Sequence, residues 1–446
     1  MRRLHVGVDD HDSPEGGCTT HFAAIAVKIL FELGAVFEDY PLLVRLNPSI
    51  PWKTRGNAAV AFRVLLPEGR VEDAVEALLQ ASSEYRGATR HPTSSPGMVF
   101  AVDTDPGVFR PIYRRALSDL ITPELAVRYV ERLGAYVPDE YRGARGVVGA
   151  AAALGALLDG EDYTFELLAY RSPEHWGTPR LVDPASVERM DRETRPYTFN
   201  NYDPQERRVL ITPHGLDPIL LGIRGESPDV LRRALELVEV GEPIDAWLIF
   251  RSNQATDAHY VPRSIAGLRP YQAGIIDAVV VEAPWVLPKG HVILRVSDGS
   301  GSIDAAFYEP TQVLPRVARE LVKGDKLRLY GVVKPASATR GLTFNVEKLE
   351  VVEIVETFKL VNPVCPLCGH RMTSAGRGKG FKCRRCGYRD PGAAKEKVPV
   401  PRSVEPGIYV PTPSAMGHLV KPLQRYGMEK SAVRRPLSAE EWSWYR

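Results

Sequence analysis

Four cysteines toward the C-terminal end constrain the fold of this chain more than any other feature. Cys365 and Cys368 form one Cys-x-x-Cys pair, Cys383 and Cys386 form a second, and fourteen residues separate the two pairs. Four thiolates on two such turns match the tetrahedral ligand set of structural Zn²⁺. Two redox motifs are a weaker interpretation, because neither pair opens a helix in a thioredoxin-like unit. The spacing therefore predicts a zinc ribbon, and disulfides are not expected.

The ribbon is basic although the whole chain is nearly neutral. A net charge of +2, from 57 basic and 55 acidic residues, means that no global field draws the chain onto nucleic acid. Locally, the ribbon carries Arg371, Arg377, Lys379, Lys382, Arg384, Arg385 and Arg389. We therefore expect it to contact RNA phosphates, with Arg384 and Arg385 as candidate RNA-binding residues.

Alternating patterns predict an α/β domain at the N-terminal end. Apolar runs typical of strands lie at residues 4–8, 42–46 and 58–66. Helical spacing of apolar residues indicates helices at 22–33 and 68–80, with Gly34 closing the first. Strands that alternate with helices are typical of the α/β class.

The middle of the chain predicts two more units. Helices at 147–158 and 228–238 alternate with strands at 163–170, 219–223 and 246–250, which indicates a ferredoxin-like α+β sandwich with long loops around 173–201. From residue 271, three strands, a helix and two strands follow in the order of an OB-fold barrel. OB barrels often bind single-stranded nucleic acid, so His291 in this unit is a candidate RNA contact.

These patterns predict a multidomain protein of α/β, α+β and β units. The expected boundaries are 1–135, 136–265, 266–357 for the OB fold, 358–392 for the zinc ribbon, and 393–446 for a basic, proline-rich extended arm. No apolar stretch approaches the roughly 20 residues that span a membrane. We expect a cytoplasmic protein with no membrane partner.

An acidic and glycine-rich segment follows the first predicted strand. Asp9, Asp10 and Asp12 cluster oxygen ligands where Mg²⁺ could be held together with the phosphates of a nucleotide. Gly16 and Gly17 allow close backbone approach to an anion, and Thr19 and Thr20 open a helix whose N-terminus favours phosphate. A solvated acidic loop with a threonine cap is the alternative. The combination favours a phosphate and metal site.

Two further loops carry candidate binding residues. The loop at 45–57 contains Lys53, Arg55 and Asn57 beside Trp52, a set suited to gripping phosphates or stacking a base, although it could be an ordinary basic connector. The loop at 252–257 offers Asn253, Gln254 and Asp257 to a polar ligand. From the residues alone, an ordinary hydrogen-bonded loop is the simpler interpretation of 252–257.

Several of these blocks together resemble the archaeal tRNA-isoleucine 2-agmatinylcytidine synthetase family. The blocks are residues 9–13 with 18–20, 45–57, 252–257, 290–291, 308–311, the four cysteines, and 411–422. They are spread over nearly the whole chain, in the order of the family. His11, Ala58 and Ala255 depart from the family pattern, where threonine, glycine and glycine are expected.

The resemblance implies an ATP-dependent ligase. A kinase-like catalytic domain at 1–135 would precede the ferredoxin-like domain, the OB fold and the ribbon. The implied substrates are agmatine and an isoleucine tRNA with a CAU anticodon, whose wobble cytidine is phosphorylated on its carbon-2 oxygen and then joined to agmatine, so that AUA is read in place of AUG. ATP, Mg²⁺ and structural Zn²⁺ are the implied cofactors, and DNA is not an expected partner.

The resemblance also assigns residues. Thr19 corresponds to the self-phosphorylated threonine of the family, and Asp9, Asp10 and Asp12 correspond to its acidic metal site. The guanidinium of agmatine prefers a planar carboxylate, for which Glu166 and Asp217 are the candidates. Two other functions stay open: a metal-dependent phosphohydrolase that acts on RNA or nucleotides, and a non-enzymatic RNA-binding protein.

Overall fold

One large sheet runs through both N-terminal units of the chain. The computed structural model, which describes residues 1–13, 16–54, 56–88, 94–337, 340–432, 434–438 and 440–444, places ten strands in it. Their order is β10-β7-β11-β3-β4-β1-β5-β6, with β2 on β4 and β24 on β11. The bounds are β1 Arg2–Asp9, β2 Val36–Phe37, β3 Leu42–Arg45, β4 Ala58–Leu66, β5 Gly97–Val102, β6 Ala135–Tyr136, β7 Thr164–Arg171, β10 Ile219–Gly225, β11 Ile244–Ser252 and β24 Trp442–Trp444.

A short parallel pairing joins the two units. β3 lies beside β11, with Leu42 opposite Arg251 and Leu43 opposite Ser252, whereas the other pairings of this sheet among the described residues are antiparallel. One continuous hydrophobic core extends on both sides of this junction. The two units are therefore held in a fixed relation, and a site between them is built on rigid elements.

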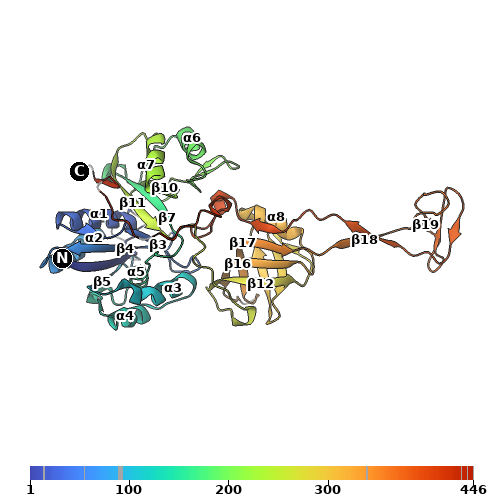
Figure 1. Ribbon diagram of the computed structural model, residues 1–446, viewed down its shortest axis with the longest axis horizontal. Helices are drawn as coiled ribbons and strands as arrows, with labels where there is room; N and C mark the ends of the chain where they lie inside the picture. Colours follow the sequence, from blue (N-terminus) through green and yellow to red (C-terminus); the bar gives the residue numbers. More distant parts are fainter. Residues whose placement is uncertain are drawn as a thin grey trace.

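Helices cover this sheet in layers (Figure 1). They are α1 Thr19–Glu32, α2 Val71–Ala88, α3 Arg110–Ser118, α4 Pro123–Glu131, α5 Gly146–Leu154, α6 Pro184–Thr194 and α7 Pro228–Leu237. α5 packs directly on β1, β4 and β5. The contact is so close that a Cβ on Gly7 would lie 2.0 Å from the carbonyl oxygen of Ala150. Glycine at position 7 thus sets the depth of α5 on the sheet.

The OB barrel has the predicted order of elements. Its strands are β12 Ala273–Val280, β13 Trp285–Val286, β14 Val292–Ser297, β15 Ser302–Phe307, β16 Lys326–Lys334 and β17 Thr343–Glu353, with α8 Val313–Arg319 between β15 and β16. β12 pairs with both β14 and β16, and a parallel pairing of β15 with β17 closes the barrel. The short β13 is an addition to the predicted strands.

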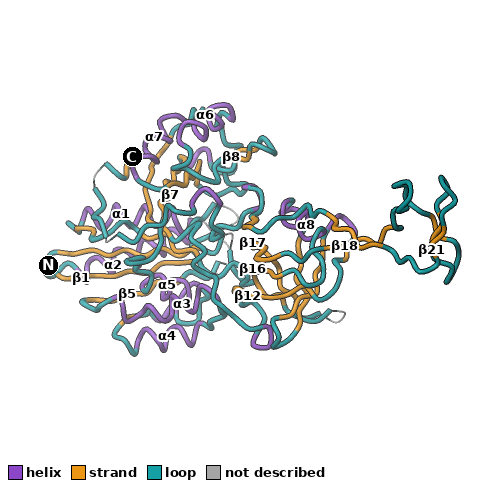
Figure 2. The backbone as a smooth tube through the Cα atoms, turned by 45° about the vertical axis from the view of Figure 1, so that its right-hand side comes forward, coloured by secondary structure: helices purple, strands orange, loops and turns teal. Residues whose placement is uncertain are grey.

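A narrow two-stranded connection carries the zinc ribbon away from the barrel (Figures 1 and 2). β18 Thr357–Val361 leads out and β22 Glu396–Val400 returns, paired antiparallel. Between them lie β19 Thr373–Ser374, β20 Phe381–Lys382 and β21 Arg389–Asp390. Within the part of the chain that the structure describes, no helix is long and apolar enough to cross a membrane.

Three local predictions need correction. The predicted loop at 173–201 contains α6, whose many charged side chains hid its apolar face. The helix predicted at 68–80 is α2, which starts after Gly69 and continues to Ala88. The C-terminal segment is not a loose arm, because β22, β23 Gly407–Tyr409 and β24 each pair with a strand from elsewhere in the chain. Pairing partners this distant in sequence leave no local pattern.

Candidate active site

The three aspartates of the acidic segment lie where β1 ends, each with its own hydrogen-bond partner. Asp9 Oδ1 accepts the Asp10 amide at 2.7 Å, and Asp10 accepts the Thr54 hydroxyl at 2.9 Å and the Ser95 amide at 3.2 Å. Burial raises the pKa of Asp9 well above its usual range, and the charges of Asp10 and Asp12 add to this effect. Burial also raises the pKa of Asp10, which the Thr54 hydroxyl partly opposes. A bound cation would relieve this crowding of negative charge.

Thr19 is the first residue of α1, and its hydroxyl is held on two sides. It donates to Asp12 Oδ2 at 2.7 Å and accepts the amide of His11 at 3.1 Å. Both Thr19 and the neighbouring Thr20 are buried, and the Thr20 hydroxyl lies 3.1 Å from Cys18 Sγ. The structure therefore brings together a threonine hydroxyl and a carboxylate that can take its proton.

The glycines between the aspartates and Thr19 shape the loop. Gly16 has a φ of +139°, and a Cβ on Gly17 would lie 2.7 Å from the His11 carbonyl oxygen. The amide of Ser13 donates to the Gly17 carbonyl at 3.1 Å, which closes the turn. Both glycines are needed for the fold of the loop, in addition to any contact with phosphate.

The predicted phosphate loop faces the acidic segment from the other side. Thr54 reaches Asp10, and Asn57, with a φ of +49°, donates its side-chain amide to the Asn47 carbonyl at 2.8 Å. Lys53 is exposed, and Arg55 lies outside the described residues. Asn57 thus shapes the loop, while Lys53 and Thr54 present polar groups to the site.

A cavity of about 430 Å³ opens beside the first two aspartates. Its apolar wall consists of Leu46, Ile50, Trp52, Ala116, Leu120, Ile121 and Val148. The polar residues that line it are Asp9, Asp10, Lys53, Thr54, Asn57, Asp119, Thr122, Glu124 and Arg145, the last at the N-terminus of α5. A flat apolar group with a charged tail fits such a lining.

A larger cavity of about 670 Å³ lies on the Thr19 side. Lys53 and Thr54 line both cavities, so the two spaces meet at this loop. The walls of the larger cavity come from five parts of the chain: the acidic segment with Thr19, the loop at 45–58, the second unit with Glu166 and Asp217, the OB residue Glu347, and residues 417–420 of the C-terminal segment.

Both candidate carboxylates for agmatine line the larger cavity, and both already have cationic partners. Glu166 contacts Arg45 at 3.0 Å and Arg224 at 3.4 Å, and all three side chains are largely buried. Asp217 contacts Arg180 at 3.2 Å and accepts the Ile219 amide at 3.2 Å. A ligand cation would have to share or displace these partners.

The polar loop at 253–257 lies behind this cavity and does not line it. Asn253 Oδ1 accepts the Arg45 amide at 2.8 Å, and Gln254 Oε1 accepts Arg45 Nε at 3.3 Å. Asp257 is engaged by the Lys348 ammonium and by the Lys421 amide. These side chains support the residues that form the wall.

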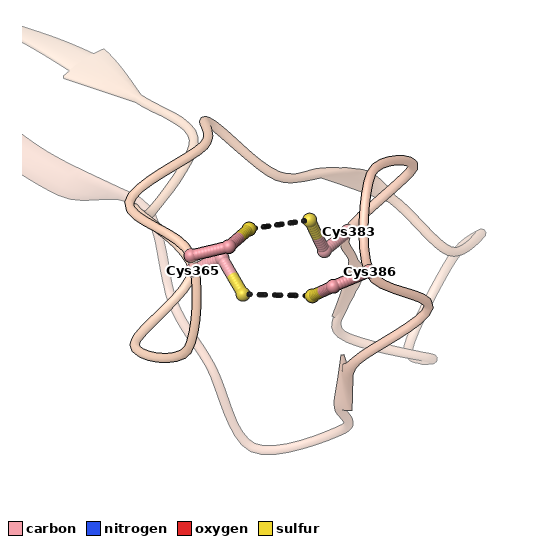
Figure 3. A group of neighbouring side chains, drawn as sticks. Cys365, Cys383 and Cys386 are labelled. Carbon is pink, nitrogen blue, oxygen red and sulfur yellow. Dashed lines mark hydrogen bonds between the residues drawn. The ribbon is translucent and has the colours of Figure 1, made fainter.

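The four cysteine sulfurs gather within the zinc ribbon, where Figure 3 labels Cys365, Cys383 and Cys386. Cys365 and Cys386 Sγ atoms lie 3.5 Å apart, as do those of Cys368 and Cys383, and all four lie within 4.8 Å of one another. Sulfurs bound to one tetrahedral Zn²⁺ at about 2.3 Å lie about 3.8 Å apart, so the cluster fits this ion. Among the described residues, no other group of three or more potential ligands was found this close together.

The candidate RNA residues are spread over the two outer units. Arg384 and Arg385 are exposed on the ribbon, as are the other basic side chains predicted there. His291 Nδ1 accepts the Glu309 amide at 3.0 Å, and its ring packs edge-on against Tyr308 at 5.2 Å. His291 therefore shapes the barrel rim, whereas the arginines are available to a partner.

Several residues of the site were not predicted as site residues. Ser95, Arg145, His418 and Glu347 enter it from four separate elements. Burial and the charges of Arg45, Arg224 and Lys53 hold the pKa of His418 well below its usual range, with the Arg45 charge the largest cause. The one sequence signal that pointed to His418 was the resemblance of residues 411–422 to the synthetase family. That resemblance assigned no role to His418.

Family models match four parts of the chain. They are described as the TiaS TCKD domain at residues 5–72, the TiaS FLD domain at 144–259, an OB-fold nucleic acid binding domain at 278–352, and the TiaS C-terminal zinc ribbon domain at 362–404. The last two matches confirm the predicted OB fold and zinc ribbon.

Full-length relatives and solved structures carry the same family name. The tRNA-isoleucine 2-agmatinylcytidine synthetase TiaS of Staphylothermus marinus is 43% identical over 99% of this chain and 98% of its own length. That of Ignisphaera aggregans is 42% identical over 97% of this chain and 95% of its own. A crystal structure of TiaS with its isoleucine tRNA and ATP is 36% identical, covers 98% of this chain and 100% of that one, and has a TM-score of 0.82. A complex with tRNA, AMPCPP and agmatine is 33% identical over the same shares, with a TM-score of 0.79. The chain therefore belongs to the TiaS family of tRNA-isoleucine 2-agmatinylcytidine synthetases.

Proposed function

We propose that this protein joins agmatine to carbon-2 of the wobble cytidine of an isoleucine tRNA with a CAU anticodon, at the expense of ATP. The observation that carries this function is full-length identity of about 40% to synthetases of that name, together with solved complexes of the family that contain tRNA, ATP and agmatine. The product would read AUA in place of AUG. The two joined cavities provide separate places for a nucleotide and an amine.

The smaller cavity is the proposed nucleotide site. Its apolar wall suits a purine base, and its polar residues would direct the phosphates past Lys53 and Thr54 toward Thr19. The N-terminus of α1, shaped by Gly16, Gly17 and Thr20, would then face the terminal phosphate. Arg55 is proposed as a further phosphate contact from the sequence alone.

Asp9, Asp10 and Asp12 are the proposed Mg²⁺ ligands. The donor set of hard oxygens suits this ion, and one or two of the carboxylates would suffice because Mg²⁺ keeps waters and phosphate oxygens in its shell. When bound, the ion would neutralise charge on a transferring phosphoryl group. Burial and, to a smaller extent, the charges of neighbouring carboxylates raise the pKa of Asp9 and Asp10, and a bound cation would offset both effects.

Asp12 is the proposed base for Thr19. Its carboxylate accepts the hydroxyl hydrogen bond, so it can take the proton as Thr19 Oγ1 attacks a phosphorus atom of ATP and the bond from that phosphorus to its bridging oxygen breaks, with the rest of the nucleotide as the leaving group. In the cytidine reaction, the carbon-2 oxygen receives a phosphoryl group and becomes a leaving group. The agmatine amine then forms the new carbon–nitrogen bond, loses a proton, and phosphate departs with the oxygen.

The larger cavity is the proposed agmatine site. Glu166 and Asp217 lie in its wall and offer carboxylates to a guanidinium, and Asn253, Gln254 and Asp257 would act on the substrate through the wall residues that they hold. The target base must leave its stack to reach this space, which costs a few kcal/mol and less in a loop than in a duplex.

The OB barrel and the zinc ribbon are the proposed tRNA-binding units. The exposed arginines Arg384 and Arg385 of the ribbon would neutralise phosphates, and His291 would shape the barrel rim that meets the RNA. We further propose a kinase-like unit at 1–135 and a ferredoxin-like unit at 136–265 that share one sheet, followed by 266–357, 358–392 and 393–446. A tRNA substrate suggests a cytoplasmic location.

One incubation tests the proposed function. The protein is mixed with ATP, Mg²⁺, agmatine and the CAU isoleucine tRNA, and the digested nucleosides are weighed by mass spectrometry. We expect a cytidine that has gained agmatine less water. An unchanged cytidine would contradict the proposal.

The same experiment separates the alternatives. Full ATP turnover without agmatine or tRNA would favour a phosphohydrolase, and RNA binding with no ATP turnover would favour a non-enzymatic RNA-binding protein. Neither alternative is favoured by the relatives, which carry the name of a synthetase.

A further inference from the structure

A buried lysine of the OB barrel lies where three parts of the chain meet. Lys348 is on β17 and is 1% exposed. Its ammonium forms an ion pair with Asp257 of the second unit and donates to the Tyr426 hydroxyl of the C-terminal segment at 3.0 Å. It also lies over the ring of Tyr330, 4.2 Å from the centroid. A buried ammonium costs free energy unless it is paired, so this pairing requires the three parts to be docked together.

Asp257 connects Lys348 to the C-terminal segment through hydrogen bonds. One of its carboxylate oxygens pairs with Lys348, and the other accepts the Lys421 amide at 2.8 Å. Its own amide donates to the Leu419 carbonyl at 2.8 Å, and the amide of Ala255 donates to the His418 carbonyl at 2.8 Å. The segment at 418–421 is therefore fastened to this loop at three points.

The backbone of the loop is strained to make these contacts. Ala255 has a φ of +57° and Asp257 a φ of +64°, a conformation that residues other than glycine rarely adopt. Such conformations persist where surrounding contacts hold them, and here both amides point at the C-terminal segment.

The segment fastened in this way is a wall of the larger cavity. Gly417, His418, Leu419 and Val420 line it together with Glu166. The neighbour of Lys348 on β17, Glu347, lines it too, and accepts hydrogen bonds from His259 at 3.3 Å and Tyr260 at 3.1 Å. The cavity is thus incomplete unless the OB barrel is docked.

We propose that Lys348 is a positioning residue for agmatine. By pairing with Asp257, it holds residues 417–420 in place as a wall of the larger cavity. The same ion pair connects that wall to the RNA-binding OB barrel. The inference rests on the proposed function of this cavity. Lys348 does not touch the substrate, so its loss should weaken agmatine use more than tRNA use.

Three variants test this role. Lys348→Met keeps the length of the side chain and removes the charge, and Lys348→Arg keeps a cation that can pair with a carboxylate and stack on aromatic rings. Lys326→Met is the matched control, because Lys326 forms an exposed ion pair with Glu353 on the same barrel. Steady-state kinetics with agmatine and tRNA varied separately are combined with hydrogen exchange of peptides that cover 253–258 and 417–422.

For Lys348→Met we expect the KM for agmatine to rise about tenfold, while the KM for tRNA changes by less than about twofold. Exchange in the two peptides should accelerate. Lys348→Arg should bring the agmatine KM back to within about threefold of wild type, and Lys326→Met should match wild type. A wild-type agmatine KM with unchanged exchange in Lys348→Met would overturn the proposal, as would equal rises in both KM values.

Tyr426→Phe provides a second variant should Lys348→Met fail to fold. It removes only the hydroxyl bonded to Lys348, so we expect a smaller rise in the agmatine KM in the same direction. No rise would overturn the role. If the wild-type protein incorporates no agmatine, the proposed function fails, whereas the exchange data still show whether Lys348 holds the segment.

Discussion

The hydroxyl of Thr19 donates a 2.7 Å hydrogen bond to Asp12 Oδ2, across a loop in which a Cβ on Gly17 would lie 2.7 Å from the His11 carbonyl oxygen. The amide of His11 donates to the same hydroxyl oxygen at 3.1 Å, which fixes the direction of its free lone pair. The hydroxyl therefore has one acceptor for its proton and a defined path of attack. Loss of the Asp12 carboxylate should therefore affect the transfer of a phosphoryl group to Thr19 more than it affects the binding of ATP.

Replacing Asp12 with asparagine should slow phosphorylation of Thr19. The amide keeps the size of the side chain and cannot take the proton, so we expect a loss of about 10²–10⁴-fold in rate. ATP affinity should fall far less than the rate, because Asp9 and Asp10 remain as Mg²⁺ ligands. Transfer of labelled phosphate to the protein is the measurement, with Thr19→Ala as the blank and Asp73→Asn, an exposed carboxylate on α2, as the control. A wild-type rate in Asp12→Asn would exclude it as the base.

Gly149→Ala should displace the Asp9 carboxylate, because α5 packs against this side chain at Gly149. An added Cβ would lie 1.9 Å from Asp9 Oδ2, whereas one on Gly143 would meet nothing within 4 Å. We expect Gly149→Ala to lower the free energy of unfolding by about 1–3 kcal/mol and to abolish most turnover. Gly143→Ala should match wild type. Denaturation and nucleoside analysis measure both effects, and an active Gly149→Ala enzyme would show that the position of Asp9 is not critical.

Arg384→Ala and Arg385→Ala should weaken tRNA binding without affecting Thr19. Each lost phosphate contact should reduce the slope of log affinity against log salt by about 0.7–0.9. Binding titrations at several salt concentrations measure the slope. Arg233→Ala, an exposed arginine on α7, is the control. If the slope of log affinity against log salt keeps its wild-type value, Arg384 and Arg385 do not contact the tRNA phosphates.

Removal of zinc should unfold the ribbon alone. Its core contains little beyond Met372, Phe381 and the cysteines, so its folding depends on the metal. Cys383→Ser or chelation should therefore lower tRNA affinity while the OB barrel and the large sheet melt as before. Calorimetry with and without chelator, and phosphorylation of Thr19, are the readouts. Loss of Thr19 phosphorylation would mean that the ribbon supports the distant site.

The stability of the N-terminal unit should depend on pH through His5. Burial, with help from the charge of Arg63, lowers the pKa of His5 to about 4 from an ordinary value near 6.5. The unfolded chain therefore binds a proton first as the pH falls, and stability is lost between about pH 6.5 and pH 4. His5→Leu should reduce the slope of unfolding free energy against pH in this window by about 1.4 kcal/mol per unit. Denaturant unfolding at several pH values measures this slope, and an unchanged slope would assign the dependence to other groups.

The sequence revealed those parts of the fold and site that are local. The strand ending at Asp9, the helix opened by Thr19, the barrel order and the ribbon all follow from neighbouring residues. The acidic segment and Thr54 were placed in separate loops, and only the pairing of β1 with β4 brings them within hydrogen-bond distance.

Local sequence patterns could not predict contacts between residues that lie far apart in the chain. The sequence analysis offers Glu166 as a carboxylate for a guanidinium, but its pairing with Arg45 and Arg224 depends on three strands that meet in the sheet. His418 reaches the cavity because the C-terminal segment returns across the molecule, and Glu347 reaches it because β17 of the OB barrel lies there. Apart from the resemblance of block 411–422, nothing in their neighbourhood in sequence distinguishes them from surface residues.

The position of β24 has a consequence for biosynthesis. This strand fills the edge of β11 beside β3, and its Trp442 stacks on Phe31 of α1 at 4.8 Å. The ribosome makes β24 after every other strand of the sheet, so the sheet that carries the acidic segment stays open until translation reaches it. A nascent chain therefore exposes part of the edge of β11 until β24 has been made, and chains released early would present this unpaired strand edge to chaperones and proteases.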